Sequence, residues 1–175
     1  LAFEIISNKK NLISLKQKNE IISLLSNCAG HTGIAGGQEL DLKFEKKKKN
    51  LNQIIDMQRK KTGKLFNFCF QSVSILGNRN KKEQIKLGRL GEDIGLLFQL
   101  ADDFLDIKGS KKIVGKPIKK DKKKGKSTLI NLMGYKNALR YGDNLKKNIL
   151  LKLKKHGKNA KELIDTIEFI HERNF

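Results

Sequence analysis

The stretch Gly95 to Gly109, GLLFQLADDFLDIKG, decides how this chain folds. Its apolar residues are dense enough for a helix that is buried on nearly every side. Yet it also contains Gln99 and three aspartates, Asp102, Asp103 and Asp106. At about 100° of rotation per residue, these four polar residues fall within an arc of about 100°. No lysine lies in this arc, although the chain carries a large surplus of lysine.

An acidic stripe on an apolar helix is expected to line an interior cavity and to bind cations, because unpaired buried carboxylates are costly. Asp102 and Asp106 are one helical turn apart. This spacing suits Mg²⁺, a hard ion that prefers oxygen ligands, keeps several waters and is usually shared with substrate phosphates. The alternative is a surface stripe salt-bridged to neighbouring lysines, but its flanks are too apolar for a surface helix.

The rest of the chain also favours helices. Its 175 residues are enough for one domain with a core. Proline occurs once and β-branched alternation is scarce, so we predict an all-α protein of a single domain, residues 1–175. Helices are expected at 1–7, 17–41, 51–76, 82–107, 129–153 and 158–175, with Gly77 and Asn78 closing the third and a lysine-rich loop from Lys108 to Lys126.

The charge balance is strongly basic, with 38 Lys and Arg against 18 Asp and Glu, a net charge of +20. A nucleic-acid partner would explain such a surplus, because clustered cations release counterions from phosphate backbones. Aromatic residues make up only 6% of the chain, and its lysine runs lack interleaved aromatic residues for base stacking. Solvated lysine faces therefore explain most of the surplus better than nucleic acid does.

The remaining composition indicates a cytoplasmic protein. Cys28 and Cys69 are far apart in sequence, and we expect both to be reduced, buried thiols. The histidines share no ligand spacing, which argues against zinc. No apolar run approaches the about 20 residues of a membrane span.

Cations that could face the acidic stripe lie in two places. In the helix 51–76, Lys61 points along the apolar side and Thr62 sits beside it, whereas Arg59 and Lys60 point away. A lysine there either extends its ammonium group to the edge or binds an anion. Downstream, lysines of the loop follow the acidic helix directly. Opposite a bound metal, they would suit a diphosphate held from both sides.

The GKST at 125–128 is not a phosphate-binding P-loop. That motif requires a glycine five residues before Gly125, where this chain has Lys120, and a preceding apolar strand. The nucleotide interpretation therefore fails on spacing and on context.

The segment FQLADDFLD, followed by GK, D and GKST, resembles the second aspartate-rich region of trans-isoprenyl diphosphate synthases. The blocks GIAGGQELDL, KTGKL and IHERNF agree in order and spacing, so the resemblance covers essentially the whole chain. It is to the bacterial farnesyl and geranylgeranyl diphosphate synthases. It implies the all-α isoprenoid synthase bundle around a central cavity. It also implies a Mg²⁺-dependent prenyltransferase that condenses an allylic diphosphate with isopentenyl diphosphate, and a homodimer.

The resemblance also assigns the metal and diphosphate ligands. Asp102 and Asp106 would coordinate Mg²⁺, with Asp103 assisting. The allylic diphosphate would be bound by the lysines Lys61, Lys116 and Lys126.

The remaining roles concern the carbocation and the cavity. Thr62 and Gln99 would lie beside the developing carbocation, and Gln38 and Asp41 would line the cavity near Lys61. The loop Lys108 to Lys126 would close over the substrate as a lid.

The chain departs from the family in one respect. The family carries a first aspartate-rich motif and the isopentenyl diphosphate ligands further upstream, and neither is present in these 175 residues. We therefore expect the chain to be the carboxy-terminal portion of a longer synthase, with the N-terminal helices missing, and to be inactive alone. A non-catalytic regulatory subunit and a basic nucleic-acid-binding module are the alternatives.

Overall fold

The computed structural model describes the backbone of residues 1–45, 47, 49–114 and 128–172, and their side chains except those of 108–114. This part of the chain contains helices and no strand, which confirms the all-α prediction. The elements are α1 (Ala2–Ser7), α2 (Leu15–Ala29), α3 (Ile34–Phe44), α4 (Leu51–Gln58), the π-helical segment η1 (Arg59–Gly63), α5 (Lys64–Leu76), α6 (Lys81–Val114), α7 (Leu129–Met133), α8 (Tyr135–Leu153), the 3₁₀ segment η2 (Lys154–Ala160) and α9 (Lys161–Glu172).

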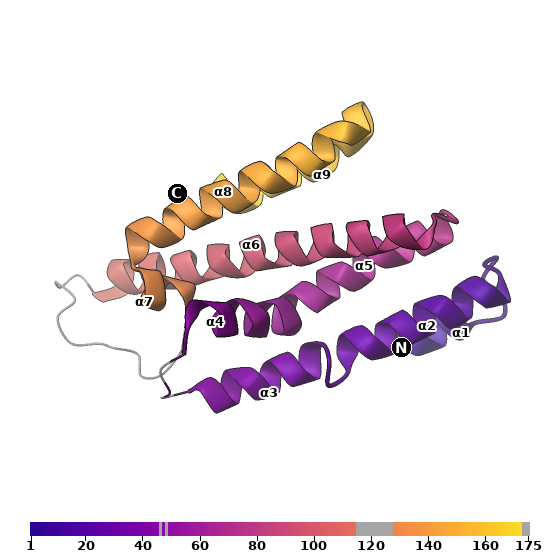
Figure 1. The fold of residues 1–175 in the computed structure, drawn as a ribbon, viewed down its shortest axis with the longest axis horizontal. Coiled ribbons are helices and arrows are strands. Elements are labelled where there is room, and N and C mark those ends of the chain that lie inside the picture. The colour runs from indigo at the N-terminus through magenta and orange to yellow at the C-terminus, as the bar shows by residue number, and fades with distance from the viewer. Residues whose placement is uncertain (46, 48, 115–127, 173–175) are drawn as a thin grey trace.

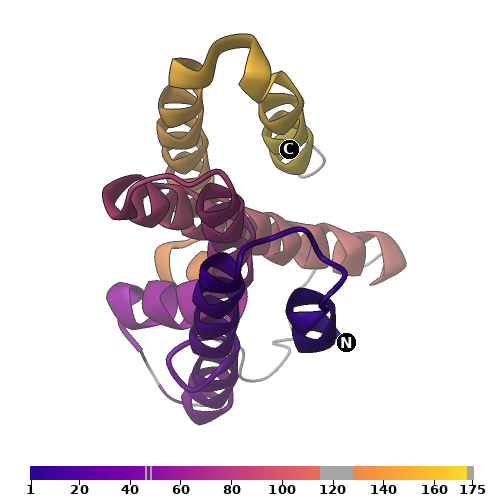
Figure 2. The same cartoon turned by 90° about the vertical axis from the view of Figure 1, so that its right-hand side faces the viewer.

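The long helices lie roughly antiparallel in layers (Figure 1). Helix α6 is central, because it contacts η1 and α5 on one side and α8 and α9 on the other. The α2–α3 layer packs beneath, with α2 against α5 and α3 against η1. Figure 2 shows α8 and α9 as a hairpin on the far side of α6 from α2 and α3. Any site on η1 therefore lies between α3 and α6.

The core is organised around α6. One cluster joins this helix to α4, α7 and α8 and includes Ile54, Leu96, Leu100, Phe104, Leu129 and Ala138. A second joins it to α8 and α9 and includes Leu90, Ile94, Leu97, Ile149 and Ile167. Fully burying one such large side chain contributes about 1.5–3 kcal/mol to folding. Most apolar residues of the stretch that begins at Gly95 are thus buried on two sides of α6, as their density predicts, whereas Leu105 is exposed.

Helix ends are fixed by side chains the sequence provides. Ser14 and Gln17 form a capping box at the start of α2. The Gln17 amide also donates to the carbonyl groups of the last two residues of α5, at 3.1 and 3.2 Å. Gly77 caps α5, and Asn78 follows with a φ of 52°. The predicted helix end at Gly77 and Asn78 is confirmed.

The helix predicted over 17–41 is wrong as one element, because the chain breaks between α2 and α3. At the break, a Cβ on Gly33 would lie 1.9 Å from the carbonyl oxygen of Cys28, so only glycine fits there. The glycines in GHTGIAGG therefore turn the chain, and they allow α3 to follow a course of its own.

Three further boundaries differ from the prediction. The helix expected over 129–153 is interrupted at Gly134, which has a φ of 78°. The last helix begins at Lys161 after the η2 segment, and residues 173–175 lie outside the described residues. The loop expected from Lys108 begins later, because the α6 backbone continues to Val114. The rest of that loop, with Lys116 and Lys126, lies outside the described residues.

Two expectations from composition can be compared with the structure. Within the described residues, every helix falls short of the length and apolar character that crossing a membrane requires. Cys28 is buried, but Cys69 is exposed, so the expectation of two buried thiols is wrong for Cys69. Cys69 lies on a face of α5 that also exposes Leu65 and Val73.

Candidate active site

Lys61 and Thr62 lie on the π-helical segment between α4 and α5. The helix predicted over 51–76 is continuous as helical backbone, but the π segment was not predicted. A π turn closes its hydrogen bonds over one more residue than an α turn, and such turns occur frequently at functional sites. Here the wider turn carries two neighbouring side chains that contact different helices, α3 and α6.

Lys61 is paired with α3. Its Nζ lies 2.6 Å from Oδ2 of Asp41, and the two side chains are 34% and 22% exposed. The backbones of α3 and η1 approach closely beside this pair, since a Cβ on Gly37 would lie 2.2 Å from the Lys61 nitrogen. The predicted proximity of Asp41 to Lys61 is therefore present. Gln38 lies next to Gly37 with its side chain exposed.

Thr62 is linked to the acidic stripe of α6 by a chain of hydrogen bonds. Its Oγ1 donates to Oε1 of Gln99 at 3.0 Å, and Nε2 of Gln99 donates to Oδ1 of Asp103 at 3.2 Å. On the other side, Nε2 of Gln58 donates to Oδ2 of Asp103 at 3.3 Å. Both oxygens of Asp103 are therefore bound by uncharged amides, and the orientation of Gln99 is fixed from both ends.

Burial raises the pKa of Asp103 to about 6. The hydrogen bonds from Gln99 and Gln58 oppose this rise, and the neighbouring charges of Asp106 and Asp102 add to it. Gln58 is only 4% exposed, and its Oε1 has no hydrogen-bond partner among the described residues. This part of the stripe is thus a partly buried acidic site whose described partners bring no positive charge.

The other two aspartates lie towards the open side of the stripe. Asp102 is half-buried, and Asp106 and Leu105 are exposed. Among the residues with described side chains, no three of the types that bind metals are gathered closely enough to hold an ion. The carboxylate donors fit Mg²⁺, since this ion takes few protein ligands and completes its shell with water and phosphate oxygens.

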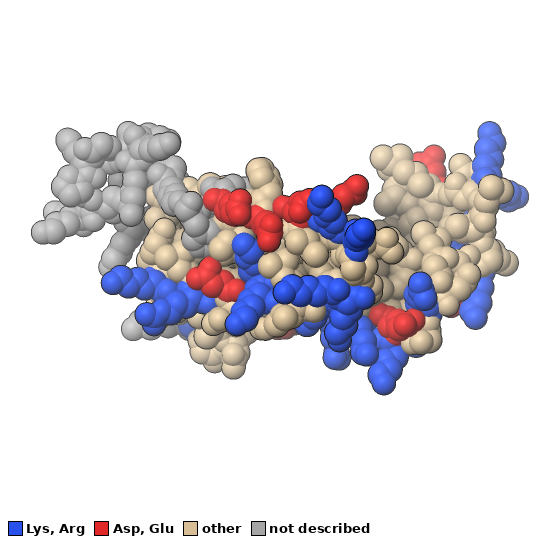
Figure 3. Space-filling model, turned by 90° about the horizontal axis from the view of Figure 1, so that it is seen from above, with Lys and Arg blue, Asp and Glu red and all other residues tan. Residues whose placement is uncertain are grey.

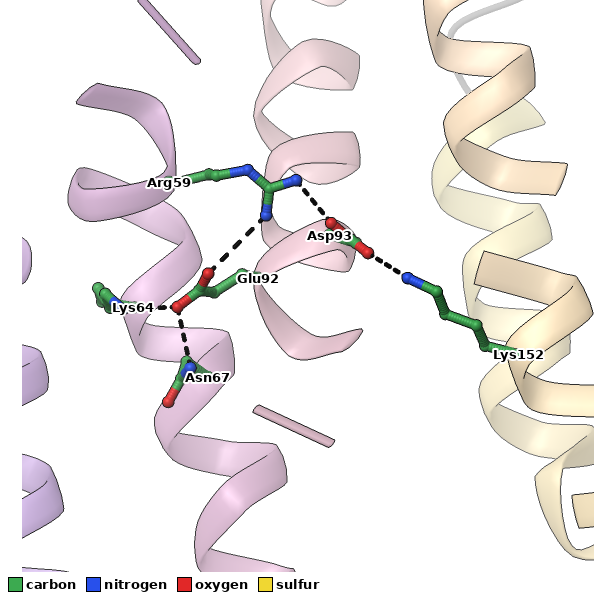
Figure 4. Close-up of polar contacts among 6 residues, drawn as sticks. All are labelled: Arg59, Lys64, Asn67, Glu92, Asp93 and Lys152. Carbon is green, nitrogen blue, oxygen red and sulfur yellow. Dashed lines mark hydrogen bonds and ion pairs between the residues drawn. The ribbon is translucent and has the colours of Figure 1, made fainter. Parts of the chain in front are cut away.

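A second polar network also involves η1 and α6, together with α5 and α8 (Figure 4). Glu92 and Asp93 are adjacent on α6 and only 14% and 13% exposed as side chains. Arg59 of η1 reaches both, at 3.8 and 2.6 Å, while Lys64 contacts Glu92 at 2.6 Å and Lys152 contacts Asp93 at 2.7 Å. The sequence indicated that Arg59 points away from the apolar side of its own helix, but not that it has these partners. The available signal was the acid pair in GEDIG between buried leucines.

Charged side chains of both signs lie on the face seen from above. Figure 3 shows most Lys and Arg side chains of this face in a row along one side, with Asp and Glu side chains beside this row and within it.

Comparisons with known proteins identify the family and the fold of this chain. The polyprenyl synthetase family profile matches residues 1–167. The chain belongs to the polyprenyl synthetase family. It is 35% identical over 133 residues to the farnesyl diphosphate synthase of Micrococcus luteus, covering 76% of this chain and 45% of that protein.

Solved structures give the same fold. A farnesyl/geranylfarnesyl diphosphate (FPP/GFPP) synthase of Zymomonas mobilis superimposes with a TM-score of 0.82 at 32% identity, over 97% of this chain and 56% of that one. A Helicobacter pylori geranyltransferase, complexed with magnesium and isoprenyl diphosphate, matches with a TM-score of 0.76 at 28% identity, over 98% and 56%. The isoprenoid synthase fold is thereby confirmed, and the chain spans about half the length of the curated relatives it matches.

Proposed function

We propose that this chain forms part of a short-chain prenyltransferase that condenses an allylic diphosphate with isopentenyl diphosphate. The observation that carries the proposal is the 3.0 Å hydrogen bond between Thr62 and Gln99, beside the Lys61–Asp41 pair. In this arrangement the Lys61 ammonium group and the uncharged side-chain oxygens of Thr62 and Gln99 lie near the same end of the acidic stripe. Family membership supports the reaction class.

In this proposal the cationic residues bind the diphosphate, and the uncharged polar residues stabilise the carbocation. The Lys61 ammonium group binds diphosphate oxygens, and Lys116 and Lys126 bind the same group in this proposal. The carbon–oxygen bond to the diphosphate breaks and leaves an allylic cation. The oxygens of Thr62 and Gln99 stabilise this cation in a site that excludes water.

The double bond of isopentenyl diphosphate then forms the new carbon–carbon bond, and loss of one proton restores a double bond. The product is a ten-, fifteen- or twenty-carbon diphosphate. Gln38 and Asp41 line the site near Lys61, and Asp41 keeps the Lys61 ammonium group oriented until the substrate arrives.

Mg²⁺ fits the donor set of the stripe, and Asp102 and Asp106 are the residues that would hold it, with Asp103 beside them. When bound, this ion neutralises the negative charge on the leaving diphosphate. The magnesium complex of the Helicobacter pylori geranyltransferase supports this part of the proposal.

The test is a prenyl transfer assay with geranyl diphosphate, isopentenyl diphosphate and Mg²⁺. It is run on the natural protein and, where the natural chain is longer, on the 175 residues alone, which hold one aspartate-rich motif and are expected to be inactive. Asp102→Asn should lower kcat/KM by about 10³-fold. Asp165→Asn, at an exposed position on α9, is the matched control and should change it little.

Absence of turnover by the natural protein would contradict the proposal, as would equal effects of the two substitutions. If the natural protein were inactive by itself but activated a co-purifying synthase, this result would instead favour a regulatory subunit. We also propose a single domain, a homodimer and a cytoplasmic location, which light scattering and cell fractionation would test.

A further inference from the structure

The π segment that carries Lys61 and Thr62 is an unusual conformation that must be held in place. Isolated π turns are rare, and backbone conformations of this kind persist where their surroundings fix them. Relaxation to an α turn would rotate the residues on one side of the segment by about 100° relative to the other. Lys61 and Thr62 would then no longer reach Asp41 and Gln99 together.

Glu92 contacts residues at both ends of this segment. Arg59 is the first residue of η1, and its Nη1 lies 3.8 Å from Oε2 of Glu92. Lys64 is the first residue after η1, and its Nζ lies 2.6 Å from Oε1 of Glu92. The same Oε1 accepts a hydrogen bond from Nδ2 of Asn67 at 2.9 Å. Figure 4 shows these groups converging on one carboxylate.

The backbone contacts leave η1 little room to move. A Cβ on Gly63, the last residue of η1, would lie 3.3 Å from the carbonyl oxygen of Glu92. A Cβ on Gly95 would lie 2.8 Å from the Gly63 Cα, and on the other side Gly37 contacts the Lys61 backbone. Helix α6 thus meets the end of η1 through its backbone and both ends through the Glu92 side chain.

We propose that Glu92 is a positioning residue that holds the π segment, so that Lys61 and Thr62 face the acidic stripe. The part of this inference that concerns Lys61 and Thr62 as ligands rests on the proposed function. The part that concerns the conformation of η1 does not, because it follows from the contacts of Glu92 with Arg59 and Lys64.

Asp93 provides a matched comparison within the same helix. It is as buried as Glu92, at 13% against 14% exposure, and it also has two cationic partners, Arg59 and Lys152. Among the described residues, its ion pairs reach only the first residue of η1 and connect it to α8 instead of to α5. A general structural role predicts equal effects of the two acids on η1, whereas the positioning role predicts that Glu92 has the larger effect.

The experiment compares Glu92→Gln with Asp93→Asn in the natural protein. Amide hydrogen exchange over residues 59–64 is followed by NMR or mass spectrometry, with no substrate present. Exchange there should be about tenfold faster in Glu92→Gln than in Asp93→Asn, at matched global stability. Binding of inorganic diphosphate with Mg²⁺, measured by calorimetry, should weaken about tenfold in Glu92→Gln and less than about threefold in Asp93→Asn.

Equal exchange in the two variants overturns the inference. Faster exchange confined to Glu92→Gln supports it even when the parent protein binds no diphosphate, a result that would count against the proposed function alone. Should Glu92→Gln fail to fold, Lys64→Gln detaches one end of η1 at a half-exposed position. Unchanged exchange over residues 59–64 in that variant also overturns the inference.

Discussion

Helix α6 carries two pairs of neighbouring acids, Glu92–Asp93 and Asp102–Asp103, in different surroundings. The first pair forms ion pairs with cationic side chains of η1, α5 and α8, at N–O distances of 2.6 to 3.8 Å. In the second pair, Asp103 accepts hydrogen bonds from two uncharged amides, and burial raises its pKa to about 6.

The difference separates Glu92 and Asp93, whose ion pairs stabilise the fold, from Asp103, whose carboxylate is suited to a cationic ligand. A buried carboxylate with cationic partners is already neutralised, so removing it leaves unpaired charges inside the protein. A carboxylate held only by amides keeps an unmet preference for a cation. The substitutions below test whether the two pairs behave in these two ways.

Among the substitutions that test this comparison, Gly37→Ala should have the largest effect. Segment η1 lies between α3 and α6, and it contacts the Glu92–Asp93 pair directly and Asp103 through Gln99. The added Cβ would lie 2.2 Å from the Lys61 nitrogen, so η1 must shift. We expect a loss of about 2–3 kcal/mol in the free energy of unfolding. Activity should fall about 100-fold, since small misplacements of catalytic groups are costly. Denaturant unfolding and the prenyl transfer assay measure the two.

Gly77→Ala is the control for this change. A Cβ at Gly77 meets its nearest neighbour at an ordinary 3.5 Å. If Gly37→Ala were as well tolerated as Gly77→Ala, the close contact between α3 and η1 would not be what positions Lys61.

Asp103→Asn should make the protein more stable at neutral pH. Because the pKa of Asp103 is raised in the folded state from 3.8 to about 6, the folded protein binds this proton more tightly than the unfolded chain does. The stability that protonation provides is therefore present below about pH 4 and is lost as the pH rises to about 6. Asparagine carries no charge, so the variant should exceed the parent by about 2–3 kcal/mol at pH 7.

The two proteins should converge below about pH 4. Urea unfolding at several pH values without Mg²⁺ measures the difference. Parallel stability curves across this range would show that Asp103 carries no burial penalty, and the contrast between the two acid pairs would fail.

The smallest effect is expected from Asp93→Asn, which removes the ion pairs to Arg59 and Lys152. These cations are 30% and 51% exposed, so solvent screens the pairs, and we expect a loss of about 1–2 kcal/mol. Activity should stay within about threefold of the parent, since Asp93 lies outside the proposed ligand set.

Lys43→Ala breaks an exposed pair with Glu39 and should leave the melting temperature unchanged within error. Thermal unfolding of both variants provides the measurement. If Asp93→Asn were as silent as Lys43→Ala, the ion pairs by which Asp93 connects η1 and α8 would not stabilise the fold.

Much of the candidate site could be predicted from residue spacing. The helical arc of Gln99, Asp102, Asp103 and Asp106 follows from a fixed rotation per residue, and it holds because α6 is regular through this stretch. The motif around Lys61 and Thr62 indicated that they belong with that arc, and the Thr62–Gln99 hydrogen bond agrees. The proximity of Asp41 was also predicted, although the helix that carries it was drawn too long.

The errors arose where local propensity competes with close packing. Spacing alone predicted one helix over 17–41, and the close contact of Gly33 with Cys28 breaks it. A glycine-rich and lysine-rich composition suggested a loop from Lys108, but the α6 backbone extends to Val114. Cys69 was expected inside because cysteine is often buried, whereas it lies on the exposed face of α5.

The sequence by itself determined the all-α class and the order along the chain of the charged and polar residues that we propose as ligands, because these depend on residue type and helical period. The tertiary structure alone decided that η1 is a π turn between α3 and α6. It also decided that Glu92 and Asp93 form ion pairs with Arg59, Lys64 and Lys152. A π turn differs from an α turn by a single residue, so contacts from other helices select it. The state of a carboxylate likewise depends on which distant side chains lie within a few ångströms of it.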